Sequence, residues 1–183
     1  MIKQRNIILK SCDEHAELDR MKGRTTWPVR RILVRLAFFT GLRVQEIANL
    51  KIKDLNLGFD DPYIFVSRKR GRSREVYILP ELVKALKGFI KEKRNWDQRT
   101  GPEAPLLSGR GGKHFTSTAL TLSFRQAVIK SGLPWAPGRK QKGDQLNLSI
   151  HSARHTYASI LYADCKNLKY VQKQLGHSSV CVD

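Results

Sequence analysis

Residues 151–158 read His-Ser-Ala-Arg-His-Thr-Tyr-Ala, and this stretch says more about the chain than any other. His151 and Arg154 are three positions apart at the start of an expected helix, so both side chains project from one face. An imidazole moves protons near neutral pH, and a guanidinium keeps its charge and clamps phosphate oxygens in bidentate fashion. The pair can therefore present one proton-transfer group and one phosphate-binding group together.

Two shorter runs contain residues of the same two kinds. Residues 40–43 read Thr-Gly-Leu-Arg, and residues 175–177 read Leu-Gly-His. Arg43 comes where one expected helix ends and the next begins, so its guanidinium can reach an anion that the amide end of the new helix also faces. Two guanidiniums and two imidazoles of this kind suit phosphoryl transfer without a metal.

Each of these residues taken alone also has a plainer interpretation. Arg43 could form only a salt bridge with Glu46, one helical turn along. His177 could be a histidine at a helix C-terminus, where the helix dipole favours it. His151 and Arg154 could be a capping histidine and a solvated arginine.

A metal site is a competing interpretation of the first stretch. His151 and His155 have the i, i+4 spacing of a metal-binding pair. However, the glutamate of the His-Glu-x-x-His zinc motif is absent, and no third ligand has a suitable spacing. We therefore expect no metal, and we expect His155 to pack or to make a structural hydrogen bond.

The charge balance indicates a polyanionic partner. The 183 residues include 34 Lys and Arg against 16 Asp and Glu, for a net charge of +18. Such an excess favours nucleic acid, because phosphates neutralised by basic side chains release condensed counterions. Anionic lipid is the weaker alternative, since no apolar run approaches the roughly 20 residues of a spanning helix. No signal-like segment follows Met1.

The three cysteines indicate a reducing compartment. Cys12, Cys165 and Cys181 are scattered, odd in number and without a Cys-x-x-Cys spacing. This usage is typical of cytosolic proteins with free thiols, and it excludes a disulfide framework or a zinc ribbon. We expect a cytoplasmic protein.

Hydrophobic periodicity predicts a mainly α-helical domain with one small antiparallel β-sheet, an α+β fold. Residues 1–25 are expected to form an arm or a short helix ahead of the domain. The expected strands cover residues 63–67 and 74–79. The expected helices cover residues 27–41, 43–50, 80–90, 117–131, 149–163 and 167–175, with loops at 97–113 and 133–148.

In order and spacing, the three polar runs resemble the catalytic domain of the tyrosine recombinases, the phage-integrase family of DNA strand-exchange enzymes. Residues 151–158 match the most characteristic box of that family almost throughout, and the resemblance spans residues 25–183. It implies site-specific recombination or integration by transesterification through a 3′-phosphotyrosyl intermediate, with no cofactor. The implied partners are double-stranded DNA and other protomers bound to that DNA, with no membrane. Without DNA we expect a monomer.

The resemblance also implies a role for each residue of the set. Arg43 and Arg154 hold the scissile phosphate, and His151 assists proton transfer. His177 donates a hydrogen bond to the phosphate or to the attacking oxygen. Glu46 supports the site without taking part in the chemistry.

Lys69 is the implied general acid, which protonates the departing 5′ hydroxyl. It is the one lysine of a basic turn, and an arginine is a poor acid because it hardly releases its proton. The turn could instead be only a finger that binds the DNA backbone. The basic residues expected to contact DNA are Arg68, Arg70, Arg72, Arg74, Lys113, Arg139, Lys140 and Lys142.

One member of the family's set is missing from the sequence. The nucleophilic tyrosine of the family follows the last histidine by about nine residues, whereas this sequence ends at Asp183. We expect Tyr157 and Tyr162 to pack in the core, and we expect the chain as given not to cleave DNA. A non-cleaving DNA-binding module and a type IB topoisomerase-like enzyme remain the alternatives.

The expected domain organisation follows from the same resemblance. Residues 26–183 form the catalytic domain, and the segment before Arg43 is too short for the separate helical domain that usually precedes it in the family. We therefore expect no core-binding domain in this sequence.

Overall fold

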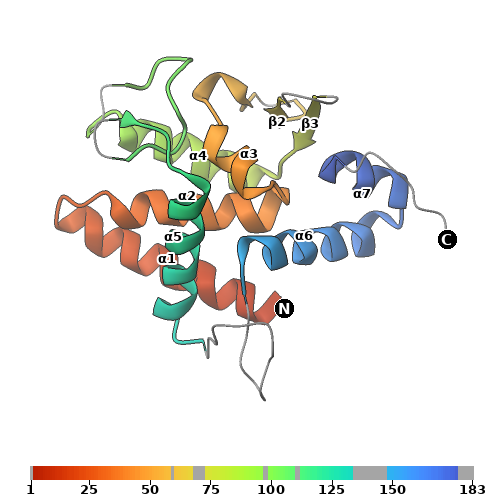
Figure 1. Cartoon of the computed structure of the whole chain (residues 1–183), viewed down its shortest axis with the longest axis horizontal. Helices are drawn as coiled ribbons and strands as arrows, with labels where there is room; N and C mark the ends of the chain where they lie inside the picture. Colours follow the sequence, from red (N-terminus) through yellow and green to blue (C-terminus); the bar gives the residue numbers. More distant parts are fainter. Residues whose placement is uncertain are drawn as a thin grey trace.

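The computed structural model describes residues 2–58, 60–67, 73–96, 99–109, 112–133 and 148–176. Within these ranges the chain forms seven α-helices and a three-stranded antiparallel sheet (Figure 1). The mainly helical α+β fold expected from the sequence is confirmed. None of the helices in these ranges is long and apolar enough to cross a membrane.

The helices begin and end within a few residues of their predicted limits. A proline in the first turn of α4 and glycines with positive φ after α2 and α7 mark these limits as expected. In chain order the helices are α1 (Ile2–Met21), α2 (Thr26–Thr40), α3 (Val44–Asn49), α4 (Pro80–Lys93), α5 (Ser117–Lys130), α6 (Ile150–Cys165) and α7 (Leu168–Leu175).

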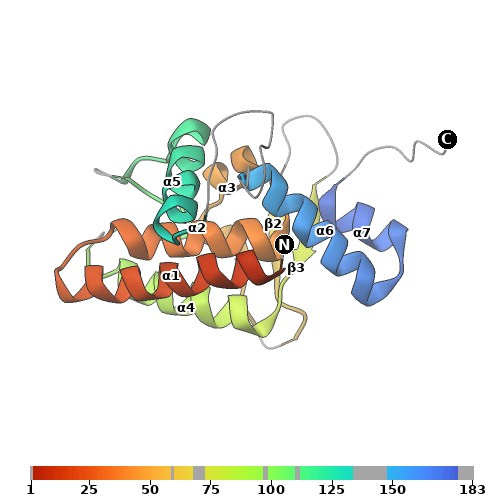
Figure 2. The ribbon, with the colours of Figure 1, turned by 90° about the horizontal axis from the view of Figure 1, so that it is seen from below.

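The first helix differs from the expected arm or short helix. α1 has 20 residues and packs along α2, and Ile8, Cys12 and Ala16 are fully buried in the common core. Burial raises the pKa of the Cys12 thiol to about 12. Figure 2 shows α1 and α2 as a central pair with α5 on one side and α4 on the other. No separate arm precedes the core in the described residues.

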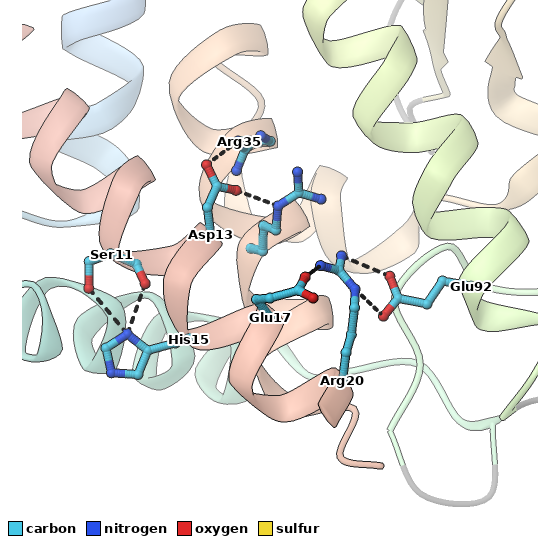
Figure 3. A network of polar contacts seen from close by, with 8 residues as sticks. Ser11, Asp13, His15, Glu17, Arg20, Arg35 and Glu92 are labelled. Carbon is cyan, nitrogen blue, oxygen red and sulfur yellow. Dashed lines mark hydrogen bonds and ion pairs between the residues drawn. The ribbon is translucent and has the colours of Figure 1, made fainter. Parts of the chain in front are cut away.

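Ion pairs reinforce the packing of α1 on its neighbours (Figure 3). The Asp13 carboxylate accepts from Nε of Arg31 at 2.5 Å and from Nη2 of Arg35 at 2.9 Å, both on α2. Arg20 donates to both carboxylate oxygens of Glu92 on α4, at 2.9 and 3.0 Å. α1 is therefore tied to two other helices near its middle and its end.

The sheet has the order β1-β2-β3, with β1 at Leu55–Asn56, β2 at Tyr63–Val66 and β3 at Arg74–Tyr77. Both pairings are antiparallel, and Ile64 lies opposite Val76 with both side chains buried. The two longer strands were predicted, whereas the two-residue β1 was not. The basic turn between β2 and β3 lies outside the described residues.

A lysine completes the inner face of α4. Lys93 is 1% exposed, and its ammonium donates to the backbone carbonyls of Pro105 and Leu106. Leu106 in turn donates from its backbone N–H to the carbonyl of Leu50 at 2.8 Å. The long connection between α4 and α5, expected as a loop, is thus anchored to the core from two sides.

Candidate active site

A cavity of about 670 Å³ opens where the start of α3, the N-terminal halves of α5 and α6, and the end of α7 converge. Arg43, His151 and Arg154 all line it, so the structure brings together three residues that are 111 positions apart at the extremes. His155 lines it as well, and Ser117 of α5 adds a hydroxyl. None of the described lining residues is Asp or Glu, which leaves the cavity open to an anion.

The wall of the cavity depends on Gly41, the residue that ends α2. Gly41 has φ +60°, a conformation that L side chains rarely adopt. A Cβ at this position would lie 2.5 Å from Cδ1 of Tyr157 and 2.9 Å from Cδ2 of Leu175. Glycine is therefore required both by the backbone turn and by the close approach of α6 and α7.

Arg154 is buried beneath this turn, with 6% of the residue exposed. Its Nη1 donates to the carbonyl of Gly41, and its Nη2 donates to the carbonyl of Leu175 at 2.8 Å. These two bonds hold the guanidinium between the end of α2 and the end of α7, at the cavity wall. The guanidinium is thus held in one orientation by the protein itself, so an anion that bound beside it would not have to order it.

Arg43 is the more exposed of the two arginines, with 45% of its side chain accessible. Its backbone N–H donates to Oε2 of Glu46 at 2.8 Å, and its Nη1 lies 3.4 Å from Oε1 of the same carboxylate. The salt bridge considered as the plainer alternative is therefore present, but the guanidinium also lines the cavity. The salt bridge to Glu46 and a place at the cavity are therefore compatible in Arg43.

Glu46 has a second and stronger partner in Arg74. Nη1 and Nη2 of Arg74 donate to the two oxygens of the Glu46 carboxylate, each at 2.9 Å. Burial alone would raise the pKa of Glu46, but the hydrogen bonds from Arg74 and from the N–H of Arg43 hold that pKa below its ordinary value. Glu46 is thus an anionic support between the two arginines.

Arg74 was expected to contact DNA, and its surroundings give it a different task. The residue is 8% exposed, and its Nε donates to the carbonyl of Gln174 at 2.9 Å. With Glu46 on its other edge, the guanidinium is turned inward as an internal brace. The alternation of β3 explains this, because Arg74 and Val76 share the buried face.

Gln174 fastens α7 to the sheet from the other side. Its Oε1 accepts from the backbone N–H of Tyr77 at 3.1 Å, and the residue is 1% exposed. α7 itself begins at Asn167, whose side chain accepts from the N–H of Tyr170, and ends at Gly176 with φ +66°. Neither Arg74 nor Gln174 was singled out as a site support from the sequence, because their partners come from distant segments.

His151 is exposed at the first turn of α6, which Ser149 and Ser152 cap reciprocally. Nε2 of His151 and Nε2 of His155 lie 2.9 Å apart, so one imidazole donates a hydrogen bond to the other. Among the described residues no group of three or more His, Cys, Asp or Glu is arranged to hold a metal ion.

Most of the remaining predicted site residues lie outside the described residues. This applies to Lys69, His177, Arg68, Arg70, Arg72, Arg139, Lys140 and Lys142. Lys113 is described and exposed, in the connection before α5, and it does not line the cavity. Its position leaves it available to a partner in solution.

The five tyrosines of the chain are all described, and none of them lines the cavity. Tyr157 packs against Gly41, and burial raises its pKa to about 12. Tyr162, expected in the core, is instead 47% exposed, because the far end of α6 extends beyond the packed helices (Figure 1).

Comparison with known proteins gives a family for this architecture. The model of the phage integrase family matches residues 9–182. Tyrosine recombinase XerC of Neisseria meningitidis serogroup C is 33% identical over 148 residues, which are 81% of this chain and 43% of that protein. Tyrosine recombinase XerH of Campylobacter jejuni is 29% identical over 150 residues, 82% of this chain and 38% of that protein.

Solved structures share the fold at lower identity. XerA recombinase has a TM-score of 0.74 at 22% identity and covers 98% of this chain and 56% of its own. XerH site-specific recombinase bound to its difH substrate has a TM-score of 0.71 at 24% identity, and the match covers 97% of this chain and 46% of that chain. A lambda integrase dimer bound to a core site has a TM-score of 0.62 at 18% identity, and the match covers 99% of this chain and 57% of that chain.

The chain spans about half the length of these relatives or less. The matched region nevertheless includes every described residue that lines the cavity. The family model covers nearly all of the sequence and agrees with the fold of the solved structures. The chain therefore belongs to the phage integrase family.

Proposed function

We propose that this chain is the catalytic part of a tyrosine-type site-specific recombinase, which cleaves and rejoins DNA strands. The observation that supports this most is the shared cavity of Arg43, His151 and Arg154, lined in its described part by no carboxylate. Relatives named as tyrosine recombinases, and a structural neighbour bound to a DNA substrate, point to the same activity. We place the activity on DNA in the cytoplasm, the compartment that the odd number and scattered spacing of the cysteines indicate.

The reaction is a transesterification at a DNA phosphate. A tyrosine oxygen attacks the phosphorus, a 3′-phosphotyrosyl bond forms, and the bond to the 5′ oxygen breaks. The tyrosine proton leaves through a base, and the departing oxygen receives a proton to become a 5′ hydroxyl. A later attack by a 5′ hydroxyl reverses these steps on another strand, so that no net bond energy is lost.

The two arginines would act on the phosphate oxygens that do not react. Arg154 is already fixed by the carbonyls of Gly41 and Leu175, and Arg43 is positioned by Glu46. Preorganised donors of this kind stabilise charge that develops in the transition state, usually the largest single term in catalysis.

Proton transfer would be shared between three residues. His151 lies at the cavity, and its bond to His155 sets which ring nitrogen carries a proton. Lys69 would protonate the departing 5′ oxygen, and His177 would donate to the phosphate or the attacking oxygen. The position of the end of α7 supports the last assignment, because Leu175 lines the cavity and His177 follows it by two residues in the sequence.

We further propose that the 183 residues by themselves do not form the covalent intermediate. This rests on the placement of the tyrosines, none of which lines the cavity. Tyr157 is also a poor nucleophile, since burial raises its pKa to about 12. A non-cleaving DNA-binding module is the second candidate function, and the same observation favours it.

The decisive experiment supplies a tyrosine about nine residues after His177, the family spacing, and offers a library of nicked duplexes with randomised half-sites. We expect a denaturation-resistant adduct at a 3′ phosphate, and none with the 183 residues alone. Arg154→Ala should reduce adduct formation by a factor of at least about 100 while DNA affinity changes little. An adduct formed without the added tyrosine would show that another residue is the nucleophile, and no adduct in any form would favour the non-cleaving module.

A further inference from the structure

Two imidazoles share a hydrogen bond at the candidate active site. His151 and His155 lie one turn apart on α6, and both line the cavity. Their Nε2 atoms are 2.9 Å apart, and the ring planes are nearly perpendicular, at 89°. An N–H···N bond needs one nitrogen that carries a hydrogen and one that is bare. The protonation of one ring is therefore coupled to that of the other.

The shared bond leaves one nitrogen of each ring for other partners. Among the described residues, no hydrogen bond reaches Nδ1 of His151 or Nδ1 of His155. Both residues are exposed, so water can reach the second ring. The two imidazoles thus form a short chain of nitrogen atoms that has one end at His151 and the other end at solvent.

The charges at the cavity are unfavourable for a proton that stays on His151. The charged side chains among its described lining residues, apart from the two histidines, are Arg43 of α3 and Arg154 of α6. α5 contributes the hydroxyls of Ser117 and Thr121 and no carboxylate. An imidazolium at His151 would therefore face two guanidiniums without a described carboxylate to offset the repulsion. A neighbouring acceptor that takes the proton onward removes this cost.

We propose that His155 is that acceptor, a relay residue that acts on the reaction through His151. The proposal rests on the proposed function, in which a tyrosine attacks a DNA phosphate. As the bond from oxygen to phosphorus forms, Nδ1 of His151 accepts the proton of the tyrosine hydroxyl. The hydrogen on Nε2 of His151 passes to Nε2 of His155, and His155 releases the hydrogen on its Nδ1 to water.

One proton enters the pair and one proton leaves it, so both rings end neutral. Each ring has then moved its hydrogen to its other nitrogen. When the strands rejoin and the tyrosine hydroxyl is formed again, the same transfers run backwards and restore the starting tautomers. The relay therefore needs a definite starting state, with hydrogen on Nε2 of His151 and on Nδ1 of His155.

The first experiment measures these tautomers in the 183-residue chain without DNA. Imidazole ¹⁵N shifts are recorded at a pH of about 8.5, where an ordinary imidazole is neutral, with a chelator present because two histidines can bind a metal ion. We expect hydrogen on Nε2 of His151 and on Nδ1 of His155. In His151→Ala the hydrogen of His155 should shift toward Nε2, because the partner that keeps this nitrogen bare is gone. The opposite tautomers, or no change in His151→Ala, would overturn the relay.

The second experiment measures the rate of covalent adduct formation on nicked DNA in the form that carries the added tyrosine. We expect His155→Ala and His155→Gln each to slow the adduct roughly tenfold, part of the usual contribution of acid–base groups. The glutamine side chain accepts a hydrogen bond from His151 but cannot carry the proton onward. Imidazole added to the buffer should restore much of the rate of His155→Ala, while DNA affinity stays the same in all forms.

Ser159→Gln is the matched control, because Ser159 is exposed one turn further along α6 and does not line the cavity. It should leave the rate unchanged, and equal melting temperatures of the variants exclude a loss of fold. If His155→Gln is as fast as the parent form, His155 only orients His151 and the relay is wrong. A slow His155→Ala that imidazole does not restore leads to the same conclusion.

Failure of the relay and failure of the proposed function give different results. If the parent form makes no adduct at all, the proposed function fails and the relay is rejected with it, whatever tautomers the first experiment finds. If the parent form and both His155 variants make the adduct at the same rate, the proposed function stands and the relay alone is overturned.

Discussion

Gly41 has three structural roles in the candidate active site. Its positive φ turns the chain from α2 toward Arg43, and its missing side chain admits the ring of Tyr157. Its carbonyl accepts a hydrogen bond from Arg154. A substitution there would disturb the fold and the position of the Arg154 guanidinium together.

We expect Gly41→Ala to lower the free energy of unfolding by about 3 kcal/mol, from the strained φ and from the clash with Tyr157. Gly132→Ala is the matched control, because Gly132 also has positive φ (+75°) but has no atom within 4 Å of an added Cβ. The control should cost only about 1 kcal/mol. Urea denaturation measures both values, and equal losses would mean that packing against Tyr157 is loose.

For single residues, the sequence predicted which side chains line the cavity better than it predicted which basic side chains are buried. Arg43, His151 and Arg154 were expected to meet, and they line one cavity. Arg74 was expected among the DNA-binding arginines, yet it is buried against Glu46. A run of basic residues does not reveal which of them faces inward, because that depends on the register of a strand and on partners far away in the sequence.

Three elements are joined through the carboxylate of Glu46. Glu46 belongs to α3, Arg74 to β3, and the carbonyl that Arg74 holds belongs to Gln174 of α7. The pKa of Glu46 is held below its ordinary value of 4.5 in the folded protein. Its charge therefore stabilises the fold fully above that value, and the stabilisation is lost as the pH falls through the lower, folded pKa.

We expect Glu46→Gln to lower the free energy of unfolding by about 3 kcal/mol at neutral pH, because it leaves Arg74 as a buried charge without its partner. The difference in unfolding free energy between the variant and wild type should shrink as the pH drops below 4.5. In that range the unfolded wild-type chain binds a proton at Glu46 more readily than the folded chain does, so wild type loses stability that the variant never had. Glu75→Gln is the control, since Glu75 is exposed on the same strand. A difference that stays constant down to pH 3 would show that charge is not what Glu46 contributes.

Helices were predictable from sequence where an apolar period continued for several turns, as in α2 and α4. The two-residue β1 was missed because so short a strand has no period of its own. Lys93 was missed for a different reason. Lys93 lies on the apolar face of α4, one turn beyond Phe89. Only the fold shows that the backbone carbonyls of Pro105 and Leu106 accept hydrogen bonds from its ammonium group.

For the molecule as a whole, charge should govern association. With a net charge of +18, two copies repel each other at low salt, whereas a polyanion brings them together. We therefore expect sedimentation of the 183-residue chain to give a monomer at moderate ionic strength, and multimers only with DNA. A stable dimer without DNA would mean that an assembly surface within these residues overcomes the repulsion.

Because Cys12 is buried, the rate at which its thiol is alkylated can report on local unfolding around α1. Thiol reagents attack the thiolate, and at neutral pH a thiol with a pKa of about 12 on a fully buried residue supplies almost none. Cys165 is exposed and should be alkylated at once. In a Cys181→Ser background, mass spectrometry should thus show one fast adduct and one slow adduct. The rate of the slow adduct measures how often α1 separates from α2, without any introduced probe.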